Sequence, residues 1–168
     1  MIEVYDNFFS QEIQHQIYTF LMNTGGWTLT GGDPTKNRFW HFENLEQINY
    51  FNDFLYKKII DKLNKKIDSF ERIYANGQTS GQCGTLHIDD GDSTFLYYPN
   101  PEWKTDYQGH LIFFNGDEED SEACRIVEYK PNRAIFFDGK IPHYADAPDR
   151  CYNDLRISLA YKLKHSTI

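Results

Sequence analysis

The sequence is poor in several features that mark particular classes of protein. Its three cysteines are widely spaced and odd in number, which gives neither a disulfide framework nor a zinc-binding spacing. A reducing cytoplasm is therefore the simplest predicted location. No apolar run approaches the length of a bilayer, and residues 1–6 lack the basic and apolar regions of a signal peptide. We expect an intracellular protein with no membrane span.

Positive charge is also scarce. The chain has 17 Lys and Arg against 25 Asp and Glu, which gives a net charge of −8. Its basic pairs, Lys57-Lys58 and Lys65-Lys66, fall in a helical pattern. Because nucleic-acid phosphate repels an acidic chain that has no basic stripe, this balance argues against a nucleic-acid substrate. The acidic run over residues 117–122 is expected to be a solvated loop.

Aromatic residues, in contrast, are abundant. They make up 17% of the 168 residues, with 13 Phe, 12 Tyr and 3 Trp, so rings must build much of the core. A chain of this length fits one domain, and it contains no repeat, low-complexity tract or linker. We therefore expect a single domain over residues 1–168, with helical support over 1–67 and a β core over 68–168. Scarce Ala beside abundant Asn, Tyr and Phe favours an AT-rich coding genome, as in a bacterium or phage.

Two helices are predicted in the first part. Ser10 is a good N-cap for the first, and apolar residues at helical spacing follow it up to Gly25-Gly26. The second is predicted to begin near Asn44, where Gln47 would complete a partial capping box. Its apolar stripe consists of Ile48, Phe51, Leu55, Ile59 and Leu63.

The second part changes to short strand-like runs separated by turn residues. These runs are Phe70–Tyr74, Gly84–Ile88, Ser93–Tyr98, His110–Phe114, Cys124–Tyr129, Ala134–Phe137 and Leu155–Leu163. Many short strands with polar turns are typical of a sandwich or a barrel-like jelly roll. Because the helices come first, they are expected to pack on the outside of one sheet, giving an α+β, mainly β domain.

Three residues form a candidate metal site. His87 and Asp89 are two apart in a predicted strand, so their side chains are expected to leave the same face. His143 follows the apolar run Ala134–Phe137, and a jelly roll brings such distant strands together at one mouth. Two histidines and one carboxylate form the facial triad that leaves open positions on a non-haem Fe(II) ion.

Arg156 is a candidate anion-binding residue on the last predicted strand, where it shares a face with Ser158. An inward-pointing Arg needs an anionic partner, since an unpaired buried charge is costly. Its planar fork suits a carboxylate.

The order of these motifs resembles the Fe(II)/2-oxoglutarate-dependent dioxygenases, in particular their prolyl 4-hydroxylase-like branch. Residues 95–103 resemble that branch's strand and turn after the first metal ligands. Residues 108–114 are similar to its Gly-Gly-x-Leu-x-Phe strand, with Gln108 in place of one Gly, and residues 131–137 resemble the strand before the distal histidine. The resemblance covers roughly residues 70–163 and implies a double-stranded β-helix, which is a cupin-like jelly roll.

The resemblance implies that His87, Asp89 and His143 bind iron. A carboxylate at position 89 favours hydroxylation, because related halogenases leave that position vacant for chloride. O2 is the implied oxidant and ascorbate a candidate additional cofactor. The implied reaction is hydroxylation of an unactivated C–H bond, coupled to conversion of 2-oxoglutarate into succinate and CO2.

The resemblance also implies a cosubstrate pocket. Arg156 would pair with the distal carboxylate of 2-oxoglutarate, and Tyr98 falls where the branch places a tyrosine that hydrogen-bonds the same group. Tyr74 falls near a second pocket tyrosine of the branch. The segment 80–84, between Tyr74 and the His-x-Asp motif, is slightly longer than is usual there.

The substrate is open at this level. A prolyl residue in a peptide is the leading prediction from the resemblance, and a free amino acid or another small molecule is a close second. A nucleic-acid demethylase is a weaker alternative, because that branch has a second Arg where this chain has Lys162. A non-catalytic metal-binding β module is the alternative from another class.

Overall fold

The computed structural model describes residues 1–116 and 121–165, so residues 117–120 of the predicted acidic loop lie outside it. Its helical elements are α1 (Gln11–Asn23), the 3-10 turn η1 (Leu45–Gln47), the π-helical segment η2 (Tyr50–Leu55), α2 (Tyr56–Leu63) and the 3-10 turn η3 (Thr105–Tyr107). Its strands are β1 (Ile2–Tyr5), β2 (Thr28–Gly31), β3 (Phe39–Phe42), β4 (Ser69–Gln78), β5 (Ser93–Tyr97), β6 (Leu111–Asn115), β7 (Glu122–Val127), β8 (Ala134–Asp138), β9 (His143–Ala145) and β10 (Arg156–Lys164).

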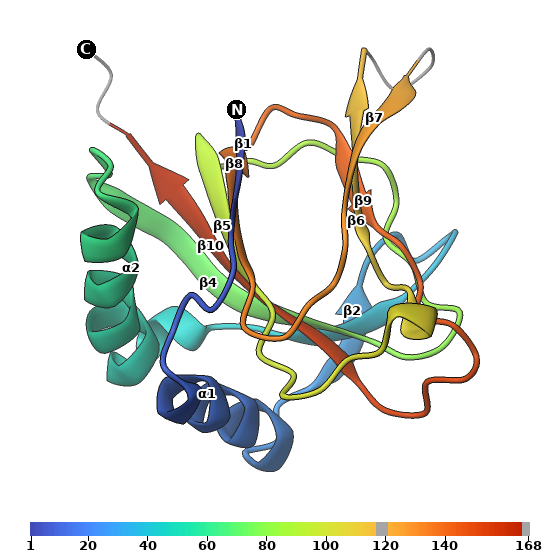
Figure 1. Ribbon diagram of the computed structural model, residues 1–168, viewed down its shortest axis with the longest axis horizontal. Coiled ribbons are helices and arrows are strands. Elements are labelled where there is room, and N and C mark those ends of the chain that lie inside the picture. The colour runs from blue at the N-terminus through green and yellow to red at the C-terminus, as the bar shows by residue number, and fades with distance from the viewer. Residues whose placement is uncertain (117–120, 166–168) are drawn as a thin grey trace.

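Two antiparallel sheets form the body of the protein. The larger has the order β1-β8-β5-β10-β4-β3-β2, and the smaller has the order β7-β6-β9. Figure 1 shows the smaller sheet standing opposite the larger one. In the larger sheet β10 is central, because it pairs with β4 on one side and with β5 on the other. The prediction of a mainly β fold is confirmed, and the strand pairs of both sheets are antiparallel.

The two faces of β10 enter different parts of the core. Ile157, Leu159 and Tyr161 belong to a buried cluster that also contains apolar residues of α1 and α2. Ala160 belongs to a second cluster, together with residues of β6 such as Phe113. Because side chains alternate along a strand, the even-numbered residues of β10 face the space between the two sheets. The candidate active-site residues of β10 lie on that side.

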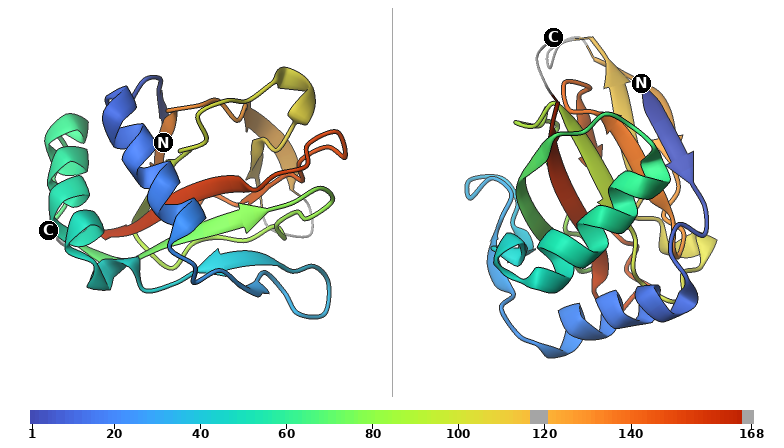
Figure 2. Two further views of the ribbon diagram at one scale, coloured as in Figure 1. Left: turned by 90° about the horizontal axis from the view of Figure 1, so that it is seen from below. Right: turned by 90° about the vertical axis from the view of Figure 1, so that its left-hand side faces the viewer.

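The helices cover the outer face of the larger sheet, as predicted (Figure 2). Ser10 is the N-cap of α1, and its hydroxyl accepts a hydrogen bond from the backbone N–H of Ile13 at 3.4 Å. Ile17 and Leu21 of α1 are fully buried against the sheet. This apolar stripe, rather than helix propensity alone, holds a helix of this length in place.

The second helix differs from its prediction at the N-terminus. Asn44 has a left-handed backbone with φ of 62° and makes no side-chain capping bond, so the predicted capping box is wrong. The chain instead passes through η1 and η2 before α2 begins. Within η2 the Tyr161 hydroxyl donates to the carbonyl oxygen of Phe51 at 3.0 Å, and an inserted donor of this kind distorts a helix locally. The predicted apolar stripe is nevertheless buried from Phe51 to Leu63.

An ion-pair cluster ties the end of β1 to the turn before β8. The Asp6 carboxylate accepts a hydrogen bond from Arg133 Nε at 2.7 Å and another from Lys130 Nζ at 3.1 Å. The bond from Arg133, helped by Lys130 and opposed by partial burial, lowers the pKa of Asp6 to about 2. Because its pKa is lowered in the folded state, Asp6 stabilises the protein at pH values above the ordinary pKa of aspartate. This stabilisation is lost as the pH falls toward 2.

We expect Asp6→Asn to lower the free energy of unfolding by less than about 1 kcal/mol at pH 7, because the pair is partly solvated. The difference from wild type should shrink below pH 4 and disappear near pH 2. Urea denaturation of both proteins across this range measures it. A difference that is the same at pH 7 and at pH 2.5 would show that Asp6 acts through something other than its charge.

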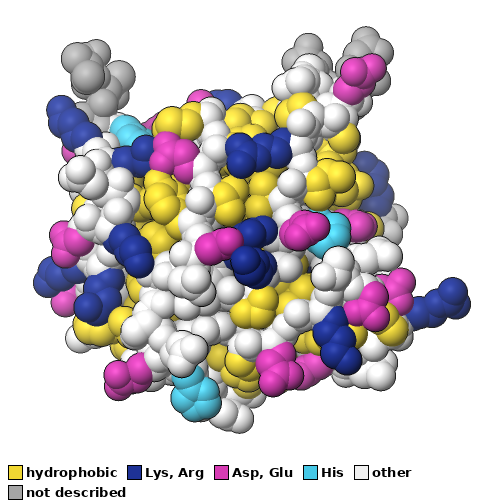
Figure 3. Space-filling view, viewed as in Figure 1, with side chains coloured by type: hydrophobic (Ala, Val, Ile, Leu, Met, Phe, Trp, Pro, Cys, Tyr) yellow, Lys and Arg dark blue, Asp and Glu magenta, His cyan; other side chains and the backbone are white. Residues whose placement is uncertain are grey.

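The surface carries charges of both signs. On the face shown in Figure 3, Lys and Arg side chains are interspersed with Asp and Glu side chains. Of the helices in the described part of the chain, none combines the length and the apolar character needed to cross a bilayer.

Candidate active site

His87 and His143 are brought together by a backbone bridge. The His87 N–H donates to the His143 carbonyl at 3.1 Å, and the His143 N–H donates to the His87 carbonyl at 2.9 Å. His143 begins β9, whereas His87 lies in the segment that precedes β5. Residues paired in this way project their side chains toward the same side, so the two rings are neighbours with centroids 4.5 Å apart.

The predicted strand over residues 84–88 is wrong. In the structure this segment forms an isolated bridge at His87 rather than part of either sheet. It is held further by the Gly84 N–H, which donates to the carbonyl of Ala145 at 2.8 Å. Glycine weakens a strand, which is consistent with the irregular backbone here. The predicted meeting of the His87 and Asp89 side chains is nevertheless observed.

Asp89 is fixed by its backbone and by its side chain. Its N–H donates to the Gly139 carbonyl at 2.7 Å, and a Cβ on Gly139 would lie 2.3 Å from the Gly91 carbonyl oxygen, so this approach requires glycine. The Thr94 hydroxyl donates to Asp89 Oδ2 at 2.5 Å, and Lys162 Nζ forms an ion pair with the same oxygen. The carboxylate is therefore buried in one defined orientation.

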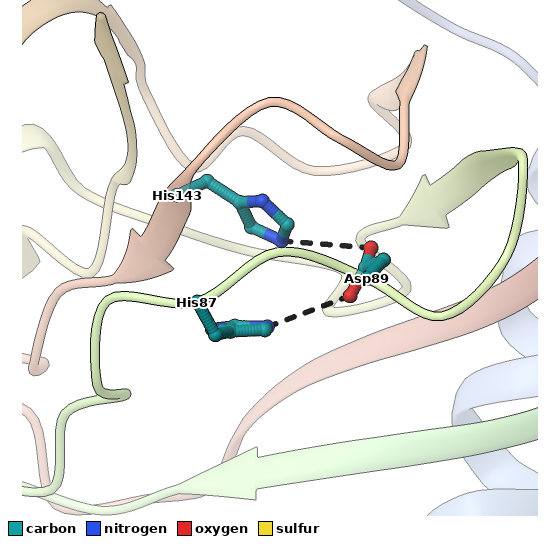
Figure 4. Close-up of side chains that lie close together, drawn as sticks. All are labelled: His87, Asp89 and His143. Atoms are coloured by element: carbon teal, nitrogen blue, oxygen red, sulfur yellow. Dashed lines mark ion pairs between the residues drawn. The ribbon is translucent and has the colours of Figure 1, made fainter. Parts of the chain in front are cut away.

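The three side chains point toward one another (Figure 4). Nε2 of His87 lies 3.5 Å from Asp89 Oδ1, and Nε2 of His143 lies 3.6 Å from Asp89 Oδ2. One ligand atom from each residue lies within 4.8 Å of the others. Nδ1 of each ring lies 2.8 Å from a carbonyl oxygen, that of Thr85 for His87 and that of Ile141 for His143. Since a carbonyl can only accept, Nδ1 carries a proton in each ring, and the neutral form of each ring presents the lone pair of Nε2 to the cluster.

This donor set fits a divalent cation. Lone pairs of two imidazoles and a carboxylate face one another at distances where they repel unless a proton or a cation lies between them. Two histidine nitrogens and one carboxylate oxygen, with further positions open, form the ligand set of non-haem Fe(II) enzymes.

The protonation states of His143 and Asp89 suit metal binding, whereas a proton competes for His87. Burial lowers the pKa of His143 to about 4, so its ring is neutral at pH 7. Burial, the largest single influence on both groups, lowers the pKa of His87 and raises that of Asp89, but the other contacts together outweigh it. The Asp89 carboxylate and the Thr85 carbonyl raise the pKa of His87, and the contact with His87 lowers that of Asp89. Lys162 and His143 lower the pKa of Asp89 further. The carboxylate is therefore ionised throughout the neutral range.

Arg156, at the start of β10, is fully buried and partly unpaired. Its Nε donates to the Gly109 carbonyl at 2.7 Å, and its Nη1 donates to Gln78 Oε1 at 2.7 Å. Its Nη2 is buried and has no hydrogen-bond partner among the described residues. A Cβ on Gly109 would lie 2.9 Å from the Arg156 side chain, so the glycine makes room for it. Because a buried guanidinium is costly without an anion, the unpaired Nη2 is a candidate anion-binding group.

Two stacked tyrosines cover this guanidinium. The rings of Tyr98 and Tyr129 have centroids 4.1 Å apart, and Arg156 Cζ lies 5.3 and 4.8 Å from their respective centres. Burial raises the pKa of both phenols, so each is a hydrogen-bond donor at neutral pH. The Tyr129 hydroxyl donates to the Ile157 carbonyl at 2.7 Å, whereas the Tyr98 hydroxyl is buried without a partner among the described residues. The free donors of Tyr98 and Arg156 together fit one carboxylate.

One face of β10 joins the anion-binding position to the metal cluster. Arg156 lies at one end of this face, and Lys162, paired with Asp89, lies at the other. Ser158 and Ala160 stand between them and have small side chains. This face therefore connects the guanidinium to the carboxylate of the histidine cluster.

Tyr74, predicted to fall near a second tyrosine of the cosubstrate pocket, lies on β4. It pairs with Ala160 across the sheet, and its ring stacks on His41 with centroids 4.9 Å apart. Together with His87 it lines a cleft of about 290 Å³. Its role in cosubstrate binding, like the roles of the other five candidate residues, stays a prediction.

Four supporting residues were not singled out from the sequence. Thr94 and Lys162 hold Asp89, and Gln78 and Tyr129 contact Arg156. Lys162 stands six residues after Arg156, so the period of two along a strand places both on one face and could have identified it. Tyr129 has no comparable local signal in a chain with 12 tyrosines.

The chain matches no sequence-family model and no curated protein. Solved structures do match it. A Pseudomonas putida prolyl-4-hydroxylase aligns with 99% of this chain and 93% of its own, with a TM-score of 0.68 and 16% identity. The viral collagen prolyl hydroxylase of Paramecium Bursaria Chlorella virus-1, solved as a 2OG complex, aligns with 96% of this chain and 94% of its own, with a TM-score of 0.66 and 16% identity.

A third match is the Trichoplax adhaerens prolyl hydroxylase, solved with a peptide fragment of hypoxia inducible factor. It aligns with 96% of this chain and 82% of its own, with a TM-score of 0.64 and 19% identity. The chain has the fold of the prolyl hydroxylases. The resemblance inferred from the sequence is thereby confirmed at the level of the fold, and the prolyl-hydroxylase-like chain also carries a His-Asp-His cluster that could hold iron.

Proposed function

We propose that the protein is an Fe(II)- and 2-oxoglutarate-dependent dioxygenase built on a double-stranded β-helix. The observation that carries this proposal is the pairing of two sites that one face of β10 connects, through Arg156 at one end and through Lys162, which contacts Asp89, near the other. One is a cluster of two Nε2 atoms and a carboxylate, and the other is a buried guanidinium with an unpaired Nη2. A metal that binds the first and a dicarboxylate that reaches the second account for both.

The metal would be held by His87, Asp89 and His143. When bound together with 2-oxoglutarate and O2, it supplies the oxidising power to hydroxylate an unactivated C–H bond, with release of succinate and CO2. The protein's own part is to present two neutral imidazoles and one ionised carboxylate. The carbonyls of Thr85 and Ile141 fix the ring tautomers for this purpose.

The cosubstrate would be held at its distal carboxylate by Arg156 and Tyr98. Both offer buried donors that have no other partner among the described residues. The stacked ring of Tyr129 and the bonds to Gly109 and Gln78 keep the guanidinium from moving. Charge-assisted bonds from a fixed fork select a carboxylate over a neutral group.

The substrate would approach through the cleft beside His87. Residues of the β2–β3 hairpin line it with His41, Glu43, Arg72 and Asn76. His87 itself is exposed on this side, with 49% of its side chain accessible. A prolyl residue in a peptide is the substrate we propose, and the peptide-bound Trichoplax neighbour supports it. A free amino acid or another small molecule is the second candidate, because the cleft volume of about 290 Å³ is close to that of a small-molecule site.

Succinate release tests this proposal and separates the two candidates. We expect the Fe(II)-loaded protein, supplied with 2-oxoglutarate and ascorbate, to form succinate faster with proline-containing peptides than with free proline or other amino acids. Mass spectrometry should show a gain of one oxygen on the stimulating substrate. A protein that binds Fe(II) and 2-oxoglutarate but forms no succinate with either class would instead be a non-catalytic metal-binding β module. A cytoplasmic location stays a prediction.

A further inference from the structure

Lys162 is a buried cation in direct contact with the proposed metal site. Its side chain is 3% exposed, and its Nζ forms an ion pair with Asp89 Oδ2. The same ammonium donates to Thr94 Oγ1 at 3.1 Å and lies 5.7 Å from the centre of the Tyr74 ring. Burying an ammonium is costly unless it is paired, and here the Asp89 carboxylate provides the opposite charge. The role assigned to it so far is to hold Asp89.

The two oxygens of Asp89 have different surroundings. Oδ2 accepts from the Thr94 hydroxyl at 2.5 Å, is paired with Lys162, and lies 3.6 Å from His143 Nε2. Oδ1 faces His87 Nε2 at 3.5 Å. Both oxygens therefore face a histidine ring, but Thr94 and Lys162 occupy Oδ2 and leave Oδ1 to His87.

We propose that Lys162 is a positioning residue that holds Asp89 through Oδ2, leaves Oδ1 as the single metal-binding oxygen, and weakens the binding of the metal by its charge. This inference rests on the proposed function, because it takes His87, Asp89 and His143 as the metal ligands. In the metal-free protein the ammonium balances the carboxylate. In the loaded protein it stays on Oδ2 and repels the divalent ion across the carboxylate.

The direction of the effect follows from the charges. Two like charges that share a buried carboxylate repel strongly because little solvent lies between them. Removing the ammonium removes this repulsion and leaves the metal as the carboxylate's main counter-charge. It also leaves an unpaired buried carboxylate in the metal-free protein, and breaking one side of a buried ion pair is strongly destabilising. A neutral residue at position 162 should therefore weaken the metal-free protein and tighten metal binding.

The test compares Lys162→Met and Lys162→Gln with Lys162→Arg, which keeps the charge. The matched control is Lys164→Met. Lys164 also lies on β10, but it is half-exposed and is paired with Glu71 instead of Asp89. Calorimetric titration with Mn(II) measures affinity, and melting temperatures are recorded with and without Mn(II). We expect Lys162→Met to bind Mn(II) at least tenfold more tightly than the wild-type protein. Its metal-free form should melt at a lower temperature, and adding Mn(II) should raise its melting temperature by more than it raises that of the wild type. Lys162→Arg and Lys164→Met should stay within threefold of the wild-type affinity.

A merely structural role for Lys162 predicts something else. In that case Lys162→Met would lower the melting temperature equally with and without Mn(II) and leave the affinity for Mn(II) unchanged. That result overturns the inference, and so does weaker Mn(II) binding in the Met variant. If Lys162→Met does not fold, Lys162→Gln provides the same comparison with a side chain that can still donate to Asp89. Failure of the wild-type protein to bind Mn(II) would overturn the proposed function as well. If the wild-type protein binds Mn(II) and the neutral variants bind it with the same affinity, only the role proposed for Lys162 is overturned.

Discussion

His87→Ala is expected to abolish 2-oxoglutarate turnover and to weaken Fe(II) or Mn(II) binding by more than about 100-fold, because it removes one of three protein ligands. His87 is the best ligand to replace. Its side chain is 49% exposed, whereas those of Asp89 and His143 are at most 5% exposed. The substitution therefore leaves neither a core cavity nor an unpaired buried Lys162. Metal titration and succinate formation are the measurements.

The matched control for this prediction is His15→Ala on the exposed side of α1. His15 contacts Thr19 at the surface and is far in the fold from the cluster. Metal affinity and turnover should match those of the wild-type protein. If His87→Ala kept the wild-type rate of succinate formation, the assignment of the metal ligands would be wrong.

Arg156→Met is expected to weaken 2-oxoglutarate binding by about 100-fold or more, since it removes charge-assisted hydrogen bonds that contribute about 1.5–3 kcal/mol each. Arg156→Lys should lose less affinity for 2-oxoglutarate than Arg156→Met, because lysine keeps the charge. It should still bind more weakly than the wild type, because lysine lacks the planar fork. Tyr98→Phe removes one unpaired donor and should have the smallest effect of the three. Calorimetric titration of the Mn(II)-loaded variants with 2-oxoglutarate gives the affinities.

Metal binding provides the internal control for the Arg156 series. Arg156 lies at the opposite end of β10 from the contact between Lys162 and Asp89, so the affinity for Mn(II) should not change. Stability should fall in Arg156→Met, because Gly109 and Gln78 lose a donor. An undiminished affinity for 2-oxoglutarate in a folded Arg156→Met protein would refute the assignment of the anion-binding position.

The candidate site was predictable where it depended on local spacing and chain order. His87 and Asp89 are two residues apart, and His143 follows an apolar strand that is buried as β8. A His-x-Asp pair is common by chance, but the same pair followed by a second histidine after an apolar strand is a more specific pattern. Arg156 was predictable because it begins a long apolar run, in which an inward charge requires a partner.

The parts that were not predictable depend on contacts between distant segments. The segment 84–88 has strand-like residues, yet it forms only the bridge between His87 and His143. The strands β1, β3 and β9 are three or four residues long, which is too short for a clear periodic pattern. The interruption of the second helix at η2 is associated with a hydrogen bond from Tyr161 of β10.

One departure from the family pattern has a structural explanation. Gln108 stands where the resembling strand has glycine, and its backbone has a φ of 55°. This left-handed region is readily adopted by glycine and is uncommon for other residues. The following Gly109, at φ of 71°, keeps the close approach to Arg156. The departure therefore changes a residue type without removing the turn that places the guanidinium.

The most direct test of the central claim is an anaerobic titration of the purified protein with Fe(II) and 2-oxoglutarate, monitored in the visible range and repeated with Arg156→Met. We expect a weak charge-transfer band when both are present. In the variant the band should fade at concentrations of 2-oxoglutarate that saturate the wild-type protein. A folded, metal-loaded wild-type protein that shows no band at saturating 2-oxoglutarate would contradict the account.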